Sequence, residues 1–116
     1  MSIESWKFRP ISWRVYDGDT VLDLVLDLGF NIQISIKTRL QGINAPEMHG
    51  ESRDEGIASR NYLRVVLDQA QRANQLQVQT NQRQGKYGRW LITFWDGKVN
   101  LNKRMVEDGF AVFQEY

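Results

Sequence analysis

Two carboxylates and a glycine open the most chemically suggestive segment of this 116-residue chain. The segment is Asp17-Gly18-Asp19-Thr20, and an apolar strand-like stretch follows it. Carboxylate oxygens are hard ligands that suit Ca²⁺ or Mg²⁺. Asp-Gly is also a common turn dipeptide, so this first cluster, taken alone, favours an ordinary turn.

The second candidate is a single arginine, Arg39, in the middle of an otherwise apolar strand. Its planar guanidinium can donate two parallel hydrogen bonds to phosphate oxygens. Because side chains alternate along a strand, Asp19, Asp23 and Arg39 fall on one polar face if no bulge intervenes. The alternative is a surface ion pair, for example between Arg39 and Asp23.

Two loops supply the remaining candidates. The first contains Glu47, one residue after Pro46, and this carboxylate could act as a general base toward a metal-held water. Taken alone, this loop favours a strand-ending turn with a solvated glutamate. The second loop is Gly85-Lys86-Tyr87-Gly88-Arg89, where lysine and tyrosine can hold a terminal phosphate and arginine can neutralise a transition state. Basic loops are common, so this cluster is not diagnostic alone.

Composition excludes several other chemistries. Without cysteine the chain has no disulfide, thiolate zinc site or cysteine nucleophile, and a single histidine, His49, excludes a two-histidine metal site. The net charge of +1 means that a phosphate must be held by locally placed cations and not by a strong global field. The chain has no apolar run near the ~20 residues of a membrane span and no signal core. We therefore expect no membrane partner and, unless a leader was removed beforehand, a cytoplasmic protein.

Hydrophobic periodicity predicts three strands in the first part of the chain. One is expected over residues 7–15, and two more over 21–40, joined as a hairpin around Gly29. Alternation predicts that both hairpin strands bury one apolar face. Its members are Leu22, Leu24, Leu26, Leu28, Phe30, Ile32, Ile34 and Ile36.

The second part of the chain predicts two helices and two strands. Apolar spacing favours a helix over 52–70, with Ser52 and Glu55 as a capping box, and then strands at 76–80 and 89–95. A short helix capped by Asn102 and ended by Gly109 should follow, with Phe110, Val112 and Phe113 packed back on the core. Three strands, a helix and two strands predict an α+β fold, a five-stranded OB-like barrel with two helices, in one domain over 1–116.

The four clusters, taken together and in this order, resemble the staphylococcal nuclease family. The resemblance covers nearly the whole chain from Trp13 to Ala111. It implies a metal-dependent nuclease that hydrolyses phosphodiester bonds in DNA or RNA. The segments that carry it are Val15-Tyr16-Asp17-Gly18-Asp19-Thr20-Val21, Arg39-Leu40-Gln41-Gly42-Ile43-Asn44-Ala45-Pro46-Glu47, Lys86-Tyr87-Gly88-Arg89, and Leu101-Asn102 through Met105-Val106 to Gly109-Phe110-Ala111.

The resemblance implies a role for five residues of the reaction site. Arg39 would grip the scissile phosphate, and Arg89 would stabilise the charged transition state. Glu47 would be the general base. Lys86 and Tyr87 would bind a nucleotide phosphate.

The resemblance also implies a divalent cation, most simply Ca²⁺, with Mg²⁺ or Mn²⁺ as alternatives. Asp19 would be a carboxylate ligand, and Ala45 would offer only its backbone carbonyl. Asn44 stands where the family's best-known enzyme has a second metal-binding aspartate, so its amide would bring an oxygen without charge. Metal affinity should fall unless another acidic residue joins the site. The candidates are Asp17, Glu51 and Asp54.

The main alternative is a catalytically silent or weak module of the same fold that binds nucleic acid or protein. The presence of Arg39, Glu47 and Arg89 together argues against silence, whereas Asn44 argues for it. A generic OB-fold strand binder would instead stack bases on exposed aromatics. Its candidates are Trp13, Trp90 and Trp95, which core packing explains at least as well.

Overall fold

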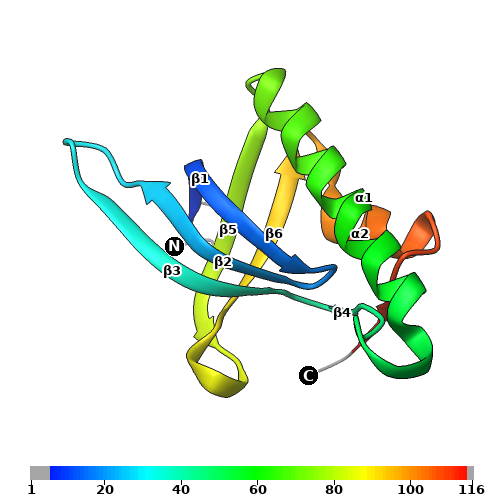
Figure 1. Ribbon diagram of the computed structural model, residues 1–116. Helices are drawn as coiled ribbons and strands as arrows, with labels where there is room; N and C mark the ends of the chain where they lie inside the picture. Colours follow the sequence, from blue (N-terminus) through cyan, green and yellow to red (C-terminus); the bar gives the residue numbers. More distant parts are fainter. Residues whose placement is uncertain (1–5, 115–116) are drawn as a thin grey trace.

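Five strands close into a barrel in the computed structural model, which describes residues 6–114 (Figure 1). Strands β1, β2 and β3 form an antiparallel meander, and β5 and β6 form a hairpin that joins β1 through β5. A parallel pairing of Thr38–Leu40 with Trp90–Ile92 closes the barrel between β3 and β6. The predicted α+β barrel is thus confirmed. The bounds are β1 Lys7–Asp17, β2 Thr20–Asp27, β3 Gln33–Leu40, β5 Leu76–Gln84 and β6 Trp90–Asp96.

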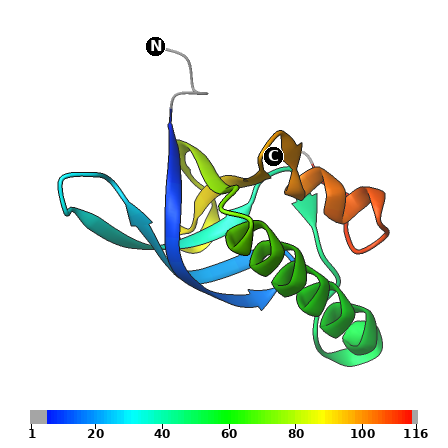
Figure 2. The same cartoon turned by 90° about the horizontal axis from the view of Figure 1, so that it is seen from above.

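The two helices lie to one side of the barrel. Helix α1 (Arg53–Arg72) runs across it, and α2 (Leu101–Glu107) packs beside it (Figure 2). No helix among residues 6–114 is long and apolar enough to cross a membrane. The remaining elements are the 3-10 turns η2 (Gly50–Ser52) and η3 (Lys86–Gly88) and the two-residue strands β4 (Ile43–Asn44), β7 (Val99–Asn100) and β8 (Val112–Phe113).

The core forms between the barrel interior and the apolar stripe of α1. The stripe is the predicted one, because Leu63, Val66, Leu67 and Ala70 are all buried. Each large aliphatic side chain buried here contributes about 1.5–3 kcal/mol. The main barrel and α2 residues of this core are Val21, Leu24, Leu40, Val78, Ile92, Phe94, Leu101 and Met105.

The outer half of the β2–β3 hairpin contradicts the prediction of a continuous buried face. Phe30 is 96% exposed, and Leu28, Ile32 and Ile34 are exposed as well. The physical reason is that β3 reaches β6 only from Thr38 onward, so the hairpin leaves the barrel before its apolar face is covered. Both views show it projecting away from the helices (Figures 1 and 2).

A bulge also breaks the predicted parity along β2. The register between β2 and β3 shifts between Val21 and Leu24, and Asp23 has a φ of 50°. Val21 and Leu24 are therefore both buried, three positions apart. Asp23 points to solvent and pairs with Arg14 at 3.2 Å, so it does not pair with Arg39.

Two predicted helix caps are wrong. The Ser52 hydroxyl donates to the Glu47 carbonyl at 2.9 Å and makes no cap hydrogen bond, so no capping box with Glu55 forms. The cap of α2 is Asn100, whose side chain accepts from the Lys103 amide at 3.1 Å.

The last described segment differs in part from the prediction. Gly109, with a φ of 85°, follows the end of α2 as expected, and Phe110 stacks on Tyr62 with ring centroids 4.2 Å apart. Val112 and Phe113 are exposed, because β8 pairs with the short β4 at the barrel surface and does not enter the core.

Candidate functional site

One cleft of about 390 Å³ gathers nearly all the residues singled out from the sequence. The β1–β2 turn, the segment from β3 through β4 and the loop before β6 form its walls. Its lining includes Asp17, Asp19, Thr20, Arg39, Asn44, Ala45, Glu47, Lys86, Arg89 and Gln114. Tyr87 does not line the cleft: it is 86% exposed and has a φ of 63°.

Asp19 is the buried centre of the cleft. Its Oδ2 accepts from the Arg39 Nη1 and from the Ala45 amide, each at 2.8 Å, and its Oδ1 accepts from the Thr20 hydroxyl at 3.0 Å. Burial alone would raise the pKa of Asp19, but hydrogen bonds from Asp17, Ala45 and Arg39 hold the pKa below its ordinary value. Asp19 is therefore an ionised carboxylate inside the protein.

Asp17 completes a pair of carboxyl groups. It accepts a hydrogen bond from the Asp19 amide at 3.0 Å. Burial, together with the neighbouring Asp19 carboxylate, raises the pKa of Asp17 to about 6. The two carboxyl groups therefore lie side by side in the cleft, and Arg39 is the cation that pairs with Asp19.

Arg39 is held in place from both sides. Besides its ion pair with Asp19, its Nη2 donates to the Ile43 carbonyl and to the Asn44 Oδ1, each at 3.2 Å. The guanidinium therefore fixes the carbonyl and amide groups of the turn that carries Asn44. The bulge in β2 does not prevent this contact, because Thr20 and Arg39 remain direct partners in the β2–β3 ladder.

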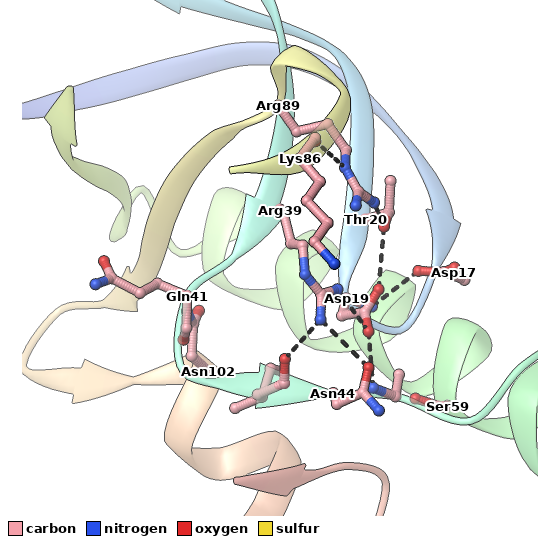
Figure 3. A network of polar contacts seen from close by, with 12 residues as sticks. Asp17, Asp19, Thr20, Arg39, Gln41, Asn44, Ser59, Lys86, Arg89 and Asn102 are labelled. Carbon is pink, nitrogen blue, oxygen red and sulfur yellow. Dashed lines mark hydrogen bonds and ion pairs between the residues drawn. The ribbon is translucent and has the colours of Figure 1, made fainter. Parts of the chain in front are cut away.

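Thr20 links the second arginine to this network (Figure 3). The Arg89 Nη1 donates to the Thr20 hydroxyl at 3.1 Å, and the same hydroxyl donates to Asp19. The Arg89 Nε donates to the Lys86 carbonyl at 3.3 Å. Thr20 was part of the sequence motif, but nothing in its residue type predicted this bridging position.

Glu47 lies at the rim of the cleft. Its side chain is 74% exposed and lies 3.4 Å from the Nε2 of His49. Its backbone is more constrained, because a Cβ added at Gly56 would lie 2.3 Å from the Glu47 carbonyl oxygen. The first turns of α1 therefore press against the main chain of Glu47, and only glycine fits at that contact.

A second close contact supports the β1–β2 turn. A Cβ added at Gly18 would lie 1.9 Å from the Oγ of Ser59, a buried residue of α1 whose hydroxyl donates to the Phe110 carbonyl at 2.8 Å. Helix α1 thus fixes the turn that carries both aspartates. Neither Ser59 nor Gln114 could be recognised from the sequence, since neither residue type signals a site by itself.

The oxygen donors of the cleft suit a hard cation. No group of three or more His, Cys, Asp or Glu side chains with metal-ligand geometry occurs within residues 6–114. Around its buried end the cleft instead offers the Asp17 and Asp19 carboxyl groups and the Asn44 amide, with the Glu47 carboxylate at the rim. Such a set fits an ion that retains water or takes up phosphate oxygens. Of the three extra acidic candidates, Asp17 lines the cleft, whereas Glu51 and Asp54 do not.

Comparison with known proteins gives one family. The model for "Staphylococcal nuclease homologue" matches residues 37–116. The matched stretch contains Arg39, Asn44, Glu47 and the loop that ends at Arg89, whereas Asp19 lies before it. No curated protein is significantly similar to the chain.

Proposed function

The chain belongs to the staphylococcal nuclease family, and from this premise we propose that it is a metal-dependent nuclease hydrolysing phosphodiester bonds in DNA or RNA. One observation carries the proposal. Two arginines from distant segments, Arg39 and Arg89, meet in one cleft and are joined through Thr20 and the ionised Asp19.

The charges of the cleft suit phosphodiester hydrolysis. The transition state carries extra negative charge around phosphorus, and prepositioned guanidinium groups stabilise that charge without reorganising. Arg39 and Arg89 would bind the phosphate oxygens, with Lys86 holding a neighbouring phosphate. Glu47, open to water at the rim, would orient or deprotonate the attacking water, a role worth ~10²–10⁴-fold in rate. Tyr87, outside the cleft, would contact substrate extending beyond it.

A divalent cation, most simply Ca²⁺, would be held by Asp19, Asn44 and the Ala45 carbonyl. Asp17 is the added carboxylate that the cleft offers. When bound, such a cation polarises phosphate oxygens and adds positive charge at the reaction centre. With an amide in place of a second aspartate, the donor set carries less charge, and we expect moderate affinity.

Replacing Asn44 with aspartate is expected to tighten Ca²⁺ binding. The substitution adds a negative charge beside the cation while nearly preserving side-chain shape. The variant should reach half-maximal activity at a lower metal concentration, although its turnover at saturation need not rise. Calorimetric titration of both proteins at one pH and ionic strength measures the difference. Equal or weaker Ca²⁺ binding by the variant would mean that Asn44 is not a metal ligand.

Degradation of supercoiled plasmid and of a single-stranded RNA tests the function directly. The purified protein is incubated with Ca²⁺, Mg²⁺, Mn²⁺ or EDTA, and an Arg39→Ala, Arg89→Ala double variant serves as the control for contaminating nuclease. Cleavage that requires metal and is lost in the double variant supports the proposal. Binding without cleavage under every condition would instead favour the silent nucleic-acid-binding module.

A further inference from the structure

The outer part of the β2–β3 hairpin, residues 28–36, projects from the barrel and is called the arm below. It presents an apolar surface that the proposed nuclease function does not use. From Leu28 to Ile36 it contains no charged residue. Its tip carries Phe30, almost completely exposed, and the neighbouring Ile32 is 54% exposed. Scattered apolar residues are normal on a protein surface, but a contiguous apolar projection typically marks an interaction site.

An apolar groove lies next to this arm, at the point where the hairpin leaves the barrel. Its volume is about 550 Å³, which is larger than that of the polar cleft. None of its lining residues is charged, so a nucleic-acid backbone would find no cation there. The lining is Trp6, Phe8, Leu26, Leu28, Ile34, Ile36, Thr80 and Trp90.

The outer edge of β3 is open beside the groove. β6 pairs with β3 at Thr38–Leu40 alone, and within residues 6–114 no other strand pairs with that edge over 33–37. Edge strands are normally protected by proline, by several charges or by a covering segment. This one has a single charge, Lys37, at its inner end. An open edge of this kind favours another extended strand as its partner.

We propose that a second copy of this chain covers this surface, with the two β3 edges paired antiparallel about a twofold axis near Ser35. This register sets Lys37 opposite Gln33 of the second copy, so no like charges face each other. It also sets Ile34 opposite Ile36 on the apolar face. A twofold contact of this kind uses the same surface on both copies and closes after two.

The same register directs each apolar tip toward the other copy's groove. The two β3 strands can pair only up to Thr38, because β6 occupies the edge of β3 from that residue onward. In this register Ile32 of the second copy is opposite Thr38, the residue that pairs with Trp90. Ile32 and Phe30 of the second copy therefore lie near Trp90. Both complementary parts, an exposed apolar tip and an apolar groove, thus occur on one chain. This self-complementarity favours a second copy over an unrelated partner.

Sedimentation velocity of the full chain from about 1 to about 100 µM tests the proposal. We expect a monomer–dimer equilibrium that Phe30→Ser and Ile34→Lys each weaken tenfold or more. The Phe30 side chain is not buried in the monomer, so replacing it should not unfold the protein. The matched control is Val65→Ser, which removes a half-exposed apolar residue from α1 and should change nothing.

Two results would overturn the dimer. One is a wild-type protein that stays monomeric at every concentration. If Phe30→Ser then also weakens RNA binding, the arm is a nucleic-acid contact instead. The other is a dimer that neither arm substitution weakens. The dimer and the nuclease can fail separately, because metal-dependent cleavage depends on the polar cleft and sedimentation reports only on self-association.

Discussion

Replacing Arg89 with alanine is expected to lower the nuclease turnover number roughly 100-fold or more, as removal of a transition-state charge stabiliser does. The side chain is partly exposed and makes hydrogen bonds only to the Thr20 hydroxyl and the Lys86 carbonyl among those described. Its loss should therefore leave the fold intact. Circular dichroism and thermal unfolding check the fold, and single-turnover cleavage measures the chemistry.

Arg39 should have an equal or larger effect on turnover but a different effect on stability. Arg39→Ala leaves the buried Asp19 without its ion-pair partner at 2.8 Å, a change that typically costs about 3–5 kcal/mol. Arg39→Lys keeps the charge and loses the planar fork, so it separates the two effects. It should recover most of the stability and little of the turnover.

Arg72→Ala is the matched control for both arginines. Arg72 lies at the far end of α1 in an exposed i,i+4 pair with Asp68, so its removal should change neither turnover nor stability appreciably. Full activity in a folded Arg89→Ala or Arg39→Lys protein would refute the role proposed for that side chain.

Replacing Asn102 with alanine is expected to lower the free energy of unfolding by roughly 3 kcal/mol, because buried polar groups lose their partners. The Asn102 amide donates to the Gln41 carbonyl at 3.0 Å and to the Ile92 carbonyl at 2.9 Å, and its Oδ1 accepts from the Phe94 amide at 3.1 Å. One side chain therefore ties α2 to β6 and to the turn after β3.

Asn100→Ala provides the comparison for this substitution. Asn100 has the same side chain two residues earlier but acts as a partly exposed helix cap, and its loss should cost about 1 kcal/mol. Urea unfolding of the two variants measures the contrast. Equal losses would mean that the buried network around Asn102 adds nothing beyond an ordinary cap.

Hydrophobic periodicity predicted the elements of the barrel well where buried apolar residues recur at a constant spacing along the chain. The α1 stripe from Leu63 to Ala70 and the Gly29 hairpin lie as expected, because each repeats one pattern over several turns or residues. The exposed tip at Phe30 was not predictable in this way. Alternation identifies an apolar face but does not say whether anything covers it.

The candidate site was predictable as a set of residues but not as a network. Residue types marked the clusters that contain Asp19, Arg39 and Arg89, the family resemblance selected these three residues, and the fold brings them into one cleft. The bridging hydroxyl of Thr20 and the burial of Asn102 depend on contacts between distant segments. Asn102 looked like a helix cap because asparagine favours both places, and only tertiary packing distinguishes them.

The parallel pairing of Thr38–Leu40 with Trp90–Ile92 is the seam that closes the barrel. It bears on when the cleft forms during folding. Short turns join β1, β2 and β3, whereas Thr38 and Trp90 come from opposite sides of α1 in the sequence. Contacts across such long loops form more slowly than local ones. Asp19 and Arg39 belong to the early meander, but Arg89 immediately precedes the seam. We therefore expect a chain that has folded only through α1 to possess the acidic half of the cleft without its second arginine, and to acquire the complete cleft only when the barrel closes.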